Sequence, residues 1–319
     1  MQIISNPTQV EIRKAAQALK DGHLVAFPTE TVYGLGADAT NENAVSRVYS
    51  VKARPTDHPL IVHISSINQL GKWAIDIPEF AIKLAEEFWP GPLTLILKRS
   101  DLAKEFITGG QENVAVRVPG HKIALQLLKE FEILGGLGVV APSANRFGAV
   151  SPTQSIHVIE ELSNMLLSSD LLIDGGPSQI GIESTIISCL GSAPVVIRPG
   201  AITYEMVRKS VGFGLTRNRV RASIKASGLL KSHYSPRAQV VLNQQPEPGD
   251  GFLALSNIPT PEGAIRLAAP ETVERYAKDL YASLRLGDEK QLDKICAILP
   301  IGDGLSEAIR DRLLKSASQ

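Results

Sequence analysis

Residues 28–38 read PTETVYGLGAD, and residues 52–63 read KARPTDHPLIVH. The first stretch is a polar loop rich in hydroxyl groups and glycine, and it follows the apolar run Leu24–Phe27, which we expect to be a strand. The second stretch contains a rigid Arg-Pro corner and leads into another short strand, Leu60–Ile64. Because an open α/β sheet usually binds its ligand beside strand ends, these two loops indicate a ligand site.

The composition is that of a soluble globular protein. Of the 319 residues, 44% are hydrophobic and 21% are charged, and the length suits two domains. The sequence shows no basic-then-apolar leader and no apolar run long enough to span a membrane, so we expect a cytoplasmic protein. Cys189 and Cys296 lie far apart in apolar runs, and we expect buried thiols there rather than a disulfide or a metal site.

Positive charge is concentrated in one segment of an otherwise neutral chain. The chain has 33 basic residues (Lys and Arg) and 33 acidic residues (Asp and Glu). This balance excludes a protein whose surface as a whole is strongly basic and suited to nucleic acid. Between Glu205 and Arg237, however, eight basic residues face a single acidic one. The segment has weak periodicity, and we predict a basic linker over residues 206–237. A loop of this length is more often functional than idle.

Helical and strand patterns are mixed along the first part of the chain. Thr8 with Glu11, then Asn41, then Pro78 each predict the start of a helix. Near-continuous apolar runs predict strands that are covered on both faces, at residues 93–97, 114–118, 139–140, 171–173, 185–190 and 195–197. We therefore predict an α/β domain over residues 1–205.

The alternation restarts at Ala238. Strand patterns lie at residues 239–242, 252–255 and 295–299, and helical patterns lie at residues 270–286 and 305–315. This order predicts a small Rossmann-like α/β/α domain over residues 238–319.

Arg117 lies inside the apolar strand 114–118, where an unpaired charge would cost several kcal/mol. We therefore expect an anionic partner for it. The partner is either a protein carboxylate in a buried ion pair or the carboxylate or phosphate of a ligand, and we favour the ligand. Arg198 ends another strand and invites the same argument with less force.

Other polar residues admit a plain structural interpretation as well as a functional one. Lys52 and Arg54 could form an ordinary solvated helix end. Turn chemistry alone would account for Ser143, Asn145 or Ser151 if each stood singly. Because they occur together at strand ends, with cations at the ends of other strands, we favour a binding site.

Several common site motifs do not fit. Gly34-x-Gly36-x-x-Ala39 superficially matches a dinucleotide fingerprint, but a loop separates the glycines from the preceding strand end. The sequence contains no P-loop motif, no Gly-x-Ser-x-Gly and no zinc-like spacing of His or Cys. His58 and His63 are too irregularly placed to hold a metal, so we expect them to form hydrogen bonds.

Six separated motifs resemble the YrdC-type threonylcarbamoyl-AMP synthase family, in order over about residues 10–205. They are Pro28–Leu35, Lys52-x-Arg54-Pro55, Trp89–Thr94, Val116–Pro119, Ser143-x-Asn145 and Glu183–Thr185. The segment Ser232–Pro236 and the ending 302–314 resemble the longer, two-domain branch of that family. Ser306 departs from the glycine that is usual in this ending.

The resemblance implies a twisted mixed-sheet YrdC-like domain and a nucleotidyltransferase activity. The reaction would condense L-threonine, bicarbonate and ATP to threonylcarbamoyl-AMP and pyrophosphate. The product would serve N6-threonylcarbamoyladenosine formation in tRNA, together with threonylcarbamoyl-transfer proteins. ATP would be a substrate with Mg²⁺ carried by its phosphates, without a tightly bound cofactor or a protein-built metal site.

The resemblance also implies roles for individual residues. Lys52 and Arg54 would be catalytic. The threonine-binding set would be Thr31, His63, Arg117, Ser143 and Ser184. The ATP-binding set would be Arg54, His58, Asn113, Ala141, Asn145, Ser151, Arg198 and Tyr234. Since Tyr234 lies in the linker, we expect the linker to close over the nucleotide as a lid.

Two other functions stay open at this point. A concave cationic surface and a basic linker would also suit a tRNA or double-stranded RNA-binding module without adenylating activity, or a weak tRNA contact beside catalysis. A carbamoyl-adenylating domain of the hydrogenase-maturation type would share the fold. Such domains usually come with zinc-finger and acylphosphatase domains, of which this sequence shows no sign.

Overall fold

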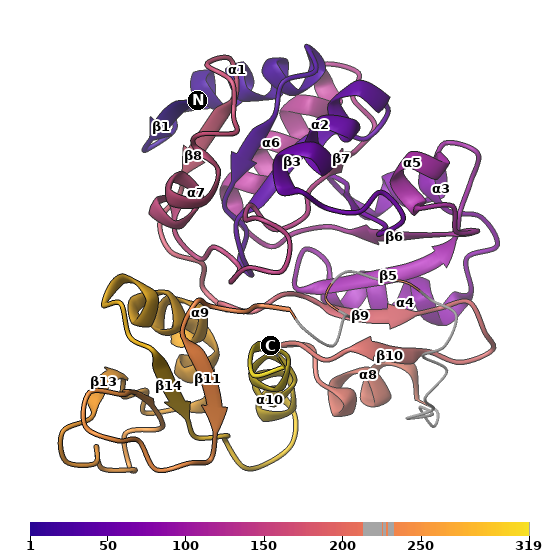
Figure 1. Cartoon of the computed structure of the whole chain (residues 1–319). Coiled ribbons are helices and arrows are strands. Elements are labelled where there is room, and N and C mark those ends of the chain that lie inside the picture. The colour runs from indigo at the N-terminus through magenta and orange to yellow at the C-terminus, as the bar shows by residue number, and fades with distance from the viewer. Residues whose placement is uncertain (213–224, 226–227, 229–232, 319) are drawn as a thin grey trace.

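The computed structural model describes residues 1–212, 225, 228 and 233–318. Two sheets organise the chain, a 10-stranded mixed sheet and a 4-stranded parallel sheet (Figure 1). The large sheet uses residues up to Arg198, and the small sheet begins at Gln239. The α/β fold class expected from the sequence, with a mixed-sheet domain followed by a small Rossmann-like one, is confirmed.

The large sheet has the strand order β1-β8-β2-β3-β7-β4-β6-β5-β9-β10. In that order the strands are β1 Gln2–Ser5, β8 Leu171–Asp174, β2 Val25–Phe27, β3 Gly34–Asp38, β7 Val139–Val140, β4 Ile61–His63, β6 Asn113–Arg117, β5 Leu93–Lys98, β9 Thr185–Ser188 and β10 Val195–Arg198. The parallel pair β4–β6 places His63 directly opposite Arg117. The side chains of His63 and Arg117 therefore lie next to each other in the middle of the sheet.

Helices cover both faces of this sheet. The helices are α1 Gln9–Lys20, α2 Glu42–Lys52, α3 Leu70–Trp73, α4 Glu79–Phe88, α5 Glu105–Thr108, α6 Lys122–Ile133, α7 Ser155–Leu162 and α8 Tyr204–Val211, with a 3₁₀ turn at Ile67–Gln69. Thr8 caps α1 in a capping box with Glu11, and Asn41 caps α2, as the sequence predicts. Helices α1 and α6 pack together over one core, and α2 and α4 bury their apolar sides in another.

The glycine-rich stretch Gly34–Asp38 corrects one expectation. It is strand β3, antiparallel to β2, and not part of the polar loop. A Cβ atom at Gly36 would lie 2.8 Å from the Phe27 ring and 2.9 Å from the Val25 carbonyl oxygen, so glycine permits this close pairing. The polar loop is therefore shorter than expected. Strand β1 and helices α3, α5, α6 and α7 were not predicted either.

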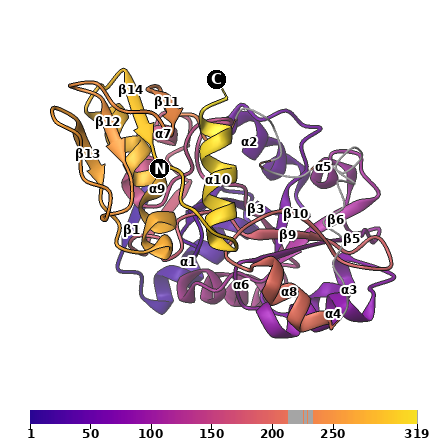
Figure 2. The same ribbon diagram turned by 90° about the horizontal axis from the view of Figure 1, so that it is seen from below.

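The small sheet has the order β11-β14-β12-β13, with every neighbouring pair parallel. Its strands are β11 Gln239–Leu242, β14 Lys294–Ala297, β12 Gly251–Leu253 and β13 Ile265–Ala268, and its helices are α9 Val273–Glu289 and α10 Leu305–Ser316. Only β13 was not predicted. Figure 2 shows α10 between the small sheet and the first domain.

The two domains share a hydrophobic core. The core of the second domain includes Val32, Val150 and Ile182 from the first. At Gly181, which has a φ of +84°, a Cβ atom would lie 2.5 Å from the Lys278 Cα atom, so the loop before β9 lies directly on the backbone of α9. Burial of apolar side chains therefore stabilises this arrangement of the domains.

Helix α8 extends to Val211, so the first residues of the predicted linker 206–237 are helical and pack on α4. Residues 213–224, 226–227 and 229–232 of that linker lie outside the described residues. Cys189 and Cys296 are free and buried, as expected. Among the described helices, none has the length and apolar character needed to cross a membrane.

Candidate active site

A narrow cavity of about 40 Å³ lies where the ends of β4, β6, β7 and β10 meet the loop before β9. Its lining includes all five residues of the predicted threonine set, Thr31, His63, Arg117, Ser143 and Ser184, together with Ala141, Arg198 and Tyr234 of the predicted ATP set. The remaining lining residues are Val32, Ile61, Pro142, Glu183 and His233. Such a volume holds only a few water molecules and is far smaller than the roughly 300 Å³ of a typical small ligand site. Substrates of the expected size would require the walls to move.

Arg117 forms a buried ion pair at the cavity wall. Its Nη2 donates to Oε1 of Glu30 at 2.6 Å, and its Nη1 donates to Oγ1 of Thr31 at 3.1 Å. The side chains of Arg117 and Glu30 are 5% and 6% exposed. The anionic partner expected from the sequence is thus present in the protein itself, which is the interpretation that we did not favour. The polar loop before β3 supplies both Glu30 and Thr31.

His63 lies beside Arg117 and is neutral at physiological pH. Burial, and then the charge of Arg117, lower the pKa of His63 to about 3. Its Nδ1 atom lies 3.2 Å from the carbonyl oxygen of Ile61. A neutral imidazole can offer one donor and one acceptor to a ligand or to the backbone.

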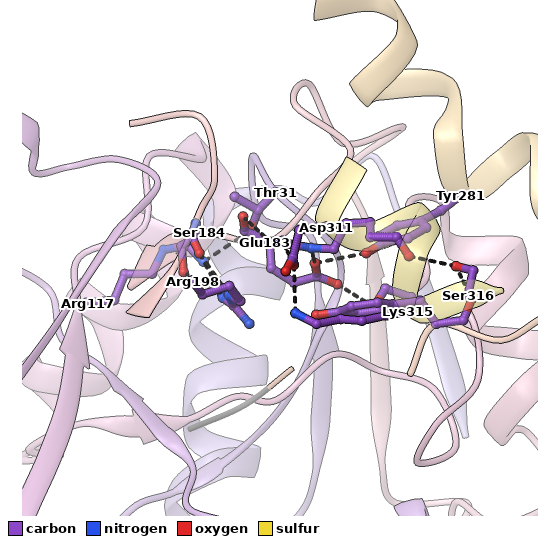
Figure 3. Close-up of polar contacts among 12 residues, drawn as sticks. Thr31, Arg117, Glu183, Ser184, Arg198, Tyr281, Asp311, Lys315 and Ser316 are labelled. Carbon is purple, nitrogen blue, oxygen red and sulfur yellow. Dashed lines mark hydrogen bonds and ion pairs between the residues drawn. The ribbon is translucent and has the colours of Figure 1, made fainter. Parts of the chain in front are cut away.

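Arg198 and Ser184 form a second polar group in the cavity (Figure 3). The Nε and Nη2 atoms of Arg198 donate to the carbonyl oxygen of Ser184 at 3.1 and 2.9 Å, and Nη2 also donates to the Ser184 Oγ at 3.2 Å. Oγ of Ser184 lies 2.7 Å from Oγ1 of Thr94 on β5. Arg198 is 2% exposed. The cavity therefore contains two buried guanidinium groups, those of Arg117 and Arg198.

Rings from four parts of the chain pack in series beside the cavity. The centroid distances are 5.2 Å for His58 to Phe147, 5.9 Å for Phe147 to His233, 4.1 Å for His233 to Tyr234 and 5.4 Å for Tyr234 to Tyr281. This ring series connects the Arg-Pro corner with α9 of the second domain. Burial lowers the pKa of His233 to about 3.

Lys52 and Arg54, the two basic residues of the Lys-x-Arg motif, donate hydrogen bonds to backbone carbonyl oxygens. The Lys52 Nζ donates to the carbonyl oxygens of Ser143 and Asn145, each at 2.5 Å. Arg54 donates to the carbonyl oxygens of His58 at 3.2 Å and Pro59 at 2.9 Å. Burial lowers the pKa of Lys52 well below its ordinary value and that of Arg54 to about 10. Neither residue forms a solvated helix end, and neither lines the narrow cavity.

The other predicted ATP-binding residues also lie outside the cavity lining. The Asn145 amide donates to the carbonyl oxygens of Arg146 and Ala149, and the Ser151 hydroxyl donates to Glu183 at 2.6 Å. Asn113 begins β6, four residues from Arg117, which corresponds to roughly 13 Å along a strand. Its position is thus separate from the threonine set.

Sequence reasoning assigned no role to several residues at the site. Glu183 and His233 belong to quoted motifs, so the motifs themselves were the available signal. Glu30 likewise lies in the opening stretch. Phe147, and Tyr281 and Arg312 from the second domain, contact the site through ring packing and through Glu183, and no local pattern marks them.

Comparisons with known proteins agree with this geometry. Residues 17–200 match the Sua5, YciO and YrdC family model described as "Telomere recombination", and residues 202–318 match the model described as "Threonylcarbamoyl-AMP synthase, C-terminal domain". The chain is 39% identical to a threonylcarbamoyl-AMP synthase of Pyrococcus abyssi, over 96% of this chain and 94% of that protein. It is 38% identical to one of Bacillus subtilis, over 96% and 93%.

A solved structure of P. abyssi Sua5 complexed with L-threonine has the same architecture. The TM-score is 0.88 at 37% identity, and the alignment covers 99% of this chain and 97% of the other. Both domains and their relative placement are therefore shared over nearly the full length. The chain belongs to the Sua5, YciO and YrdC family, in the branch that carries the threonylcarbamoyl-AMP synthase C-terminal domain.

Proposed function

We propose that this protein condenses L-threonine, bicarbonate and ATP to threonylcarbamoyl-AMP and pyrophosphate. The observation that carries the proposal is that every member of the threonine-binding set implied by the sequence lines one cavity. The relatives named as threonylcarbamoyl-AMP synthases, and the related structure with bound L-threonine, support the same substrate class.

The chemistry needs little from the protein beyond position and positive charge. Threonine and bicarbonate give an N-carboxylate with loss of water. One oxygen of that carboxylate attacks the α-phosphorus of ATP, a new P–O bond forms, and the bond to the β-phosphate breaks with release of pyrophosphate. The attacking oxygen already carries charge, so no protein nucleophile is required. Cations that face the developing charge would supply the stabilisation.

Arg117 is the proposed clamp for the threonine carboxylate. A guanidinium carries five N–H donors, so it can bond a ligand in addition to Glu30, Thr31 and the Gly91 carbonyl oxygen. Hydroxyl groups of Thr31, Ser143 and Ser184, and the neutral His63, would complete the contacts to threonine.

Arg54 and Arg198 are the proposed partners of the triphosphate, and Mg²⁺ would arrive with ATP. Lys52 would act with Arg54 mainly by fixing the Ser143–Asn145 loop, because its ammonium group already bonds two carbonyl oxygens there. His58, Asn113, Ala141, Asn145 and Ser151 complete the proposed nucleotide site.

Tyr234 is the proposed lid residue. It lines the cavity with 1% exposure, its φ is +63°, and its buried hydroxyl has no hydrogen-bond partner among the residues that the structure describes. A non-glycine residue in the left-handed region together with an unsatisfied polar atom favours a segment that changes conformation when a ligand binds. Opening of His233 and Tyr234 would enlarge the cavity.

Pyrophosphate release tests the function. We expect release only when threonine, bicarbonate and ATP are all present. Mass spectrometry with labelled bicarbonate and a mixture of amino acids should show one labelled threonylcarbamoyl-AMP product. If no pyrophosphate forms and the protein instead binds tRNA tightly in a salt-sensitive manner, it is an RNA-binding module. Passage of the product to tRNA by separate transfer proteins belongs to the same proposal.

A further inference from the structure

Glu183 lies at the junction of the two domains and bonds to both. Its Oε2 accepts hydrogen bonds from Nε of Arg312 and from the Tyr281 hydroxyl, both at 2.9 Å. Its Oε1 accepts from the Ser151 hydroxyl at 2.6 Å. Arg312 lies on α10 and Tyr281 on α9, whereas Glu183 lines the cavity of the first domain. The Glu183 carboxylate is thus one point at which the second domain contacts a wall of the proposed active site.

This carboxylate is buried, charged and close to two cations. Arg312 and Tyr281 are both 0% exposed, and Glu183 is 8% exposed. Burial alone raises the pKa of Glu183, but Arg312 and then Arg198 outweigh that effect and lower the pKa to about 2. Glu183 is therefore ionised at neutral pH, and either arginine could serve as its counter-ion.

Arg198 bonds the residue that follows Glu183 in the chain, Ser184, and lines the same cavity. Figure 3 shows Glu183 between Arg198 and Tyr281. Within the part of the chain that the structure describes, the ion pair of Glu183 is with Arg312. If the carboxylate turned toward Arg198, it would reduce the positive potential that Arg198 presents to an anion.

Further contacts of helix α10 hold the Arg312 side chain next to Glu183. Asp311 accepts from Arg312 at 2.7 Å and from Lys315 at 2.6 Å, so two cations share its charge. The Arg312 guanidinium lies 5.6 Å from the centroid of the Tyr234 ring, and the Ser316 hydroxyl donates to the Tyr234 carbonyl oxygen at 2.9 Å. Residues one turn apart on a helix share a face, so Arg312, Lys315 and Ser316 act together on this region.

We propose that Arg312 and Tyr281 are positioning residues of the active site, which hold the Glu183 carboxylate so that it does not neutralise the charge of Arg198 toward the ATP phosphates. The second domain would then contribute to nucleotide binding without contacting the nucleotide itself. This inference rests on the proposed function, because it takes Arg198 as a phosphate ligand.

The test measures binding of a non-hydrolysable ATP analogue with Mg²⁺ by calorimetry, on the full chain. Arg312→Met should weaken binding about tenfold or more, because the Glu183 charge loses its partner and turns to Arg198. The double variant Arg312→Met with Glu183→Gln removes the competing charge and should bind within about threefold of the unaltered protein. Tyr281→Phe removes one of two donors to Oε2 and should weaken binding by about threefold.

Arg310→Met is the matched control. Arg310 lies on the same helix and donates to the Pro300 carbonyl oxygen at 2.7 Å, away from Glu183, so its loss should leave binding unchanged. If the double variant binds as weakly as Arg312→Met, Arg312 has only a structural role and the inference is rejected. Unaltered binding by Arg312→Met would reject it as well.

Two safeguards keep the result clear. Should Arg312→Met fail to fold, Tyr281→Phe with and without Glu183→Gln tests the same relation, and absence of recovery by Glu183→Gln overturns it. Calorimetry needs no turnover, so binding of the analogue without pyrophosphate release would reject the proposed function alone. Normal pyrophosphate release without recovery in the double variant would reject the inference alone.

Discussion

Arg117 and Glu30 form an ion pair of 2.6 Å in which both side chains are buried. A carboxylate ligand at this wall would share the guanidinium with Glu30, which therefore orients Arg117 for the ligand. Because Glu30 Oε2 is buried and lacks a hydrogen-bond partner within the described part of the chain, the pair also has unused acceptor capacity. The same contact thus bears on stability and on substrate binding, and variants should separate the two.

Replacement of Arg117 by alanine should affect both properties. We expect the KM for threonine to rise about tenfold or more, since a charge-assisted hydrogen bond contributes roughly 1.5 kcal/mol or more. The free energy of unfolding should fall by about 3 to 5 kcal/mol, because Glu30 is left buried without its counter-ion. Denaturant unfolding and pyrophosphate kinetics measure the two effects. Arg275→Ala, which breaks an exposed ion pair on α9, should change neither by much. An unchanged threonine KM would remove Arg117 from the site.

Lys52→Met should destabilise the loop that bears Ser143 and Asn145. Two buried carbonyl oxygens would lose their common donor, at a cost of roughly 1 to 3 kcal/mol each. Chemical denaturation should therefore show a clear loss of stability, and kcat for pyrophosphate release should fall with it. Lys72→Met removes an exposed lysine of α3 and provides the comparison. Equal stability of the two variants would contradict the proposed role of Lys52.

Tyr234→Ala should bind ATP more weakly and release product intermediates more readily than the unaltered protein. The ring packs against His233 and Tyr281 and lines the cavity, so its removal opens the site. Tyr234→Phe keeps the ring and loses only a hydroxyl that has no hydrogen-bond partner among residues 1–212, 225, 228 and 233–318, so it should behave almost normally. Two measurements distinguish Tyr234→Ala from Tyr234→Phe. One is the affinity for ATP by calorimetry, and the other is the amount of product that escapes into solution. Identical kinetics for both variants would dismiss the lid.

Stability should fall as the pH drops below about 6.5. Burial lowers the pKa of His63 and His233 to about 3 and that of His157 to about 4, from an ordinary value of 6.5. At pH values between the lowered pKa and 6.5, each of these histidines is protonated in the unfolded chain but not in the folded chain. The free energy of unfolding therefore falls as the pH is lowered through this range. His157→Gln removes one of these histidines, so the slope of the free energy of unfolding against pH should decrease by up to about 1.4 kcal/mol per pH unit, the contribution of one proton. Parallel curves for the two proteins, from urea unfolding at several pH values, would refute this.

Most strands, and helices α1, α2, α4, α9 and α10, could be predicted because one physical signal dominated in each. Val114–Arg117 and Leu93–Leu97 lie in continuous apolar runs because both faces of the sheet are covered. Strand β3 was missed because its glycines, which allow close pairing with β2, have low strand propensity. Helix α7 was missed as well, and its cap has no side-chain hydrogen bond to mark its start.

The motifs alone indicated that the members of the predicted threonine set would lie together, and three of them, His63, Arg117 and Ser143, lie at or just after the ends of the neighbouring strands β4, β6 and β7. His63 and Arg117, for example, are directly opposed in the β4–β6 pair. The partners of Glu183 could not be found in this way, since Tyr281 and Arg312 come from another domain about a hundred residues away in the chain. Residues that form a long-range ion pair have no characteristic spacing in the sequence, so a sequence pattern cannot identify them. For the same reason a protein ion pair of Arg117 was considered but not preferred, and the sequence did not identify Glu30 as the partner.

The position of Arg312 on α10 has a consequence for synthesis on the ribosome. The large sheet is complete once Arg198 has emerged, and N-terminal domains generally fold first. At that moment Glu183 has already been synthesised, whereas its counter-ion Arg312 and the donor Tyr281 are still untranslated. A nascent chain would therefore pass through a stage in which the Glu183 carboxylate turns to Arg198, and nucleotide capture should begin only after α10 has docked.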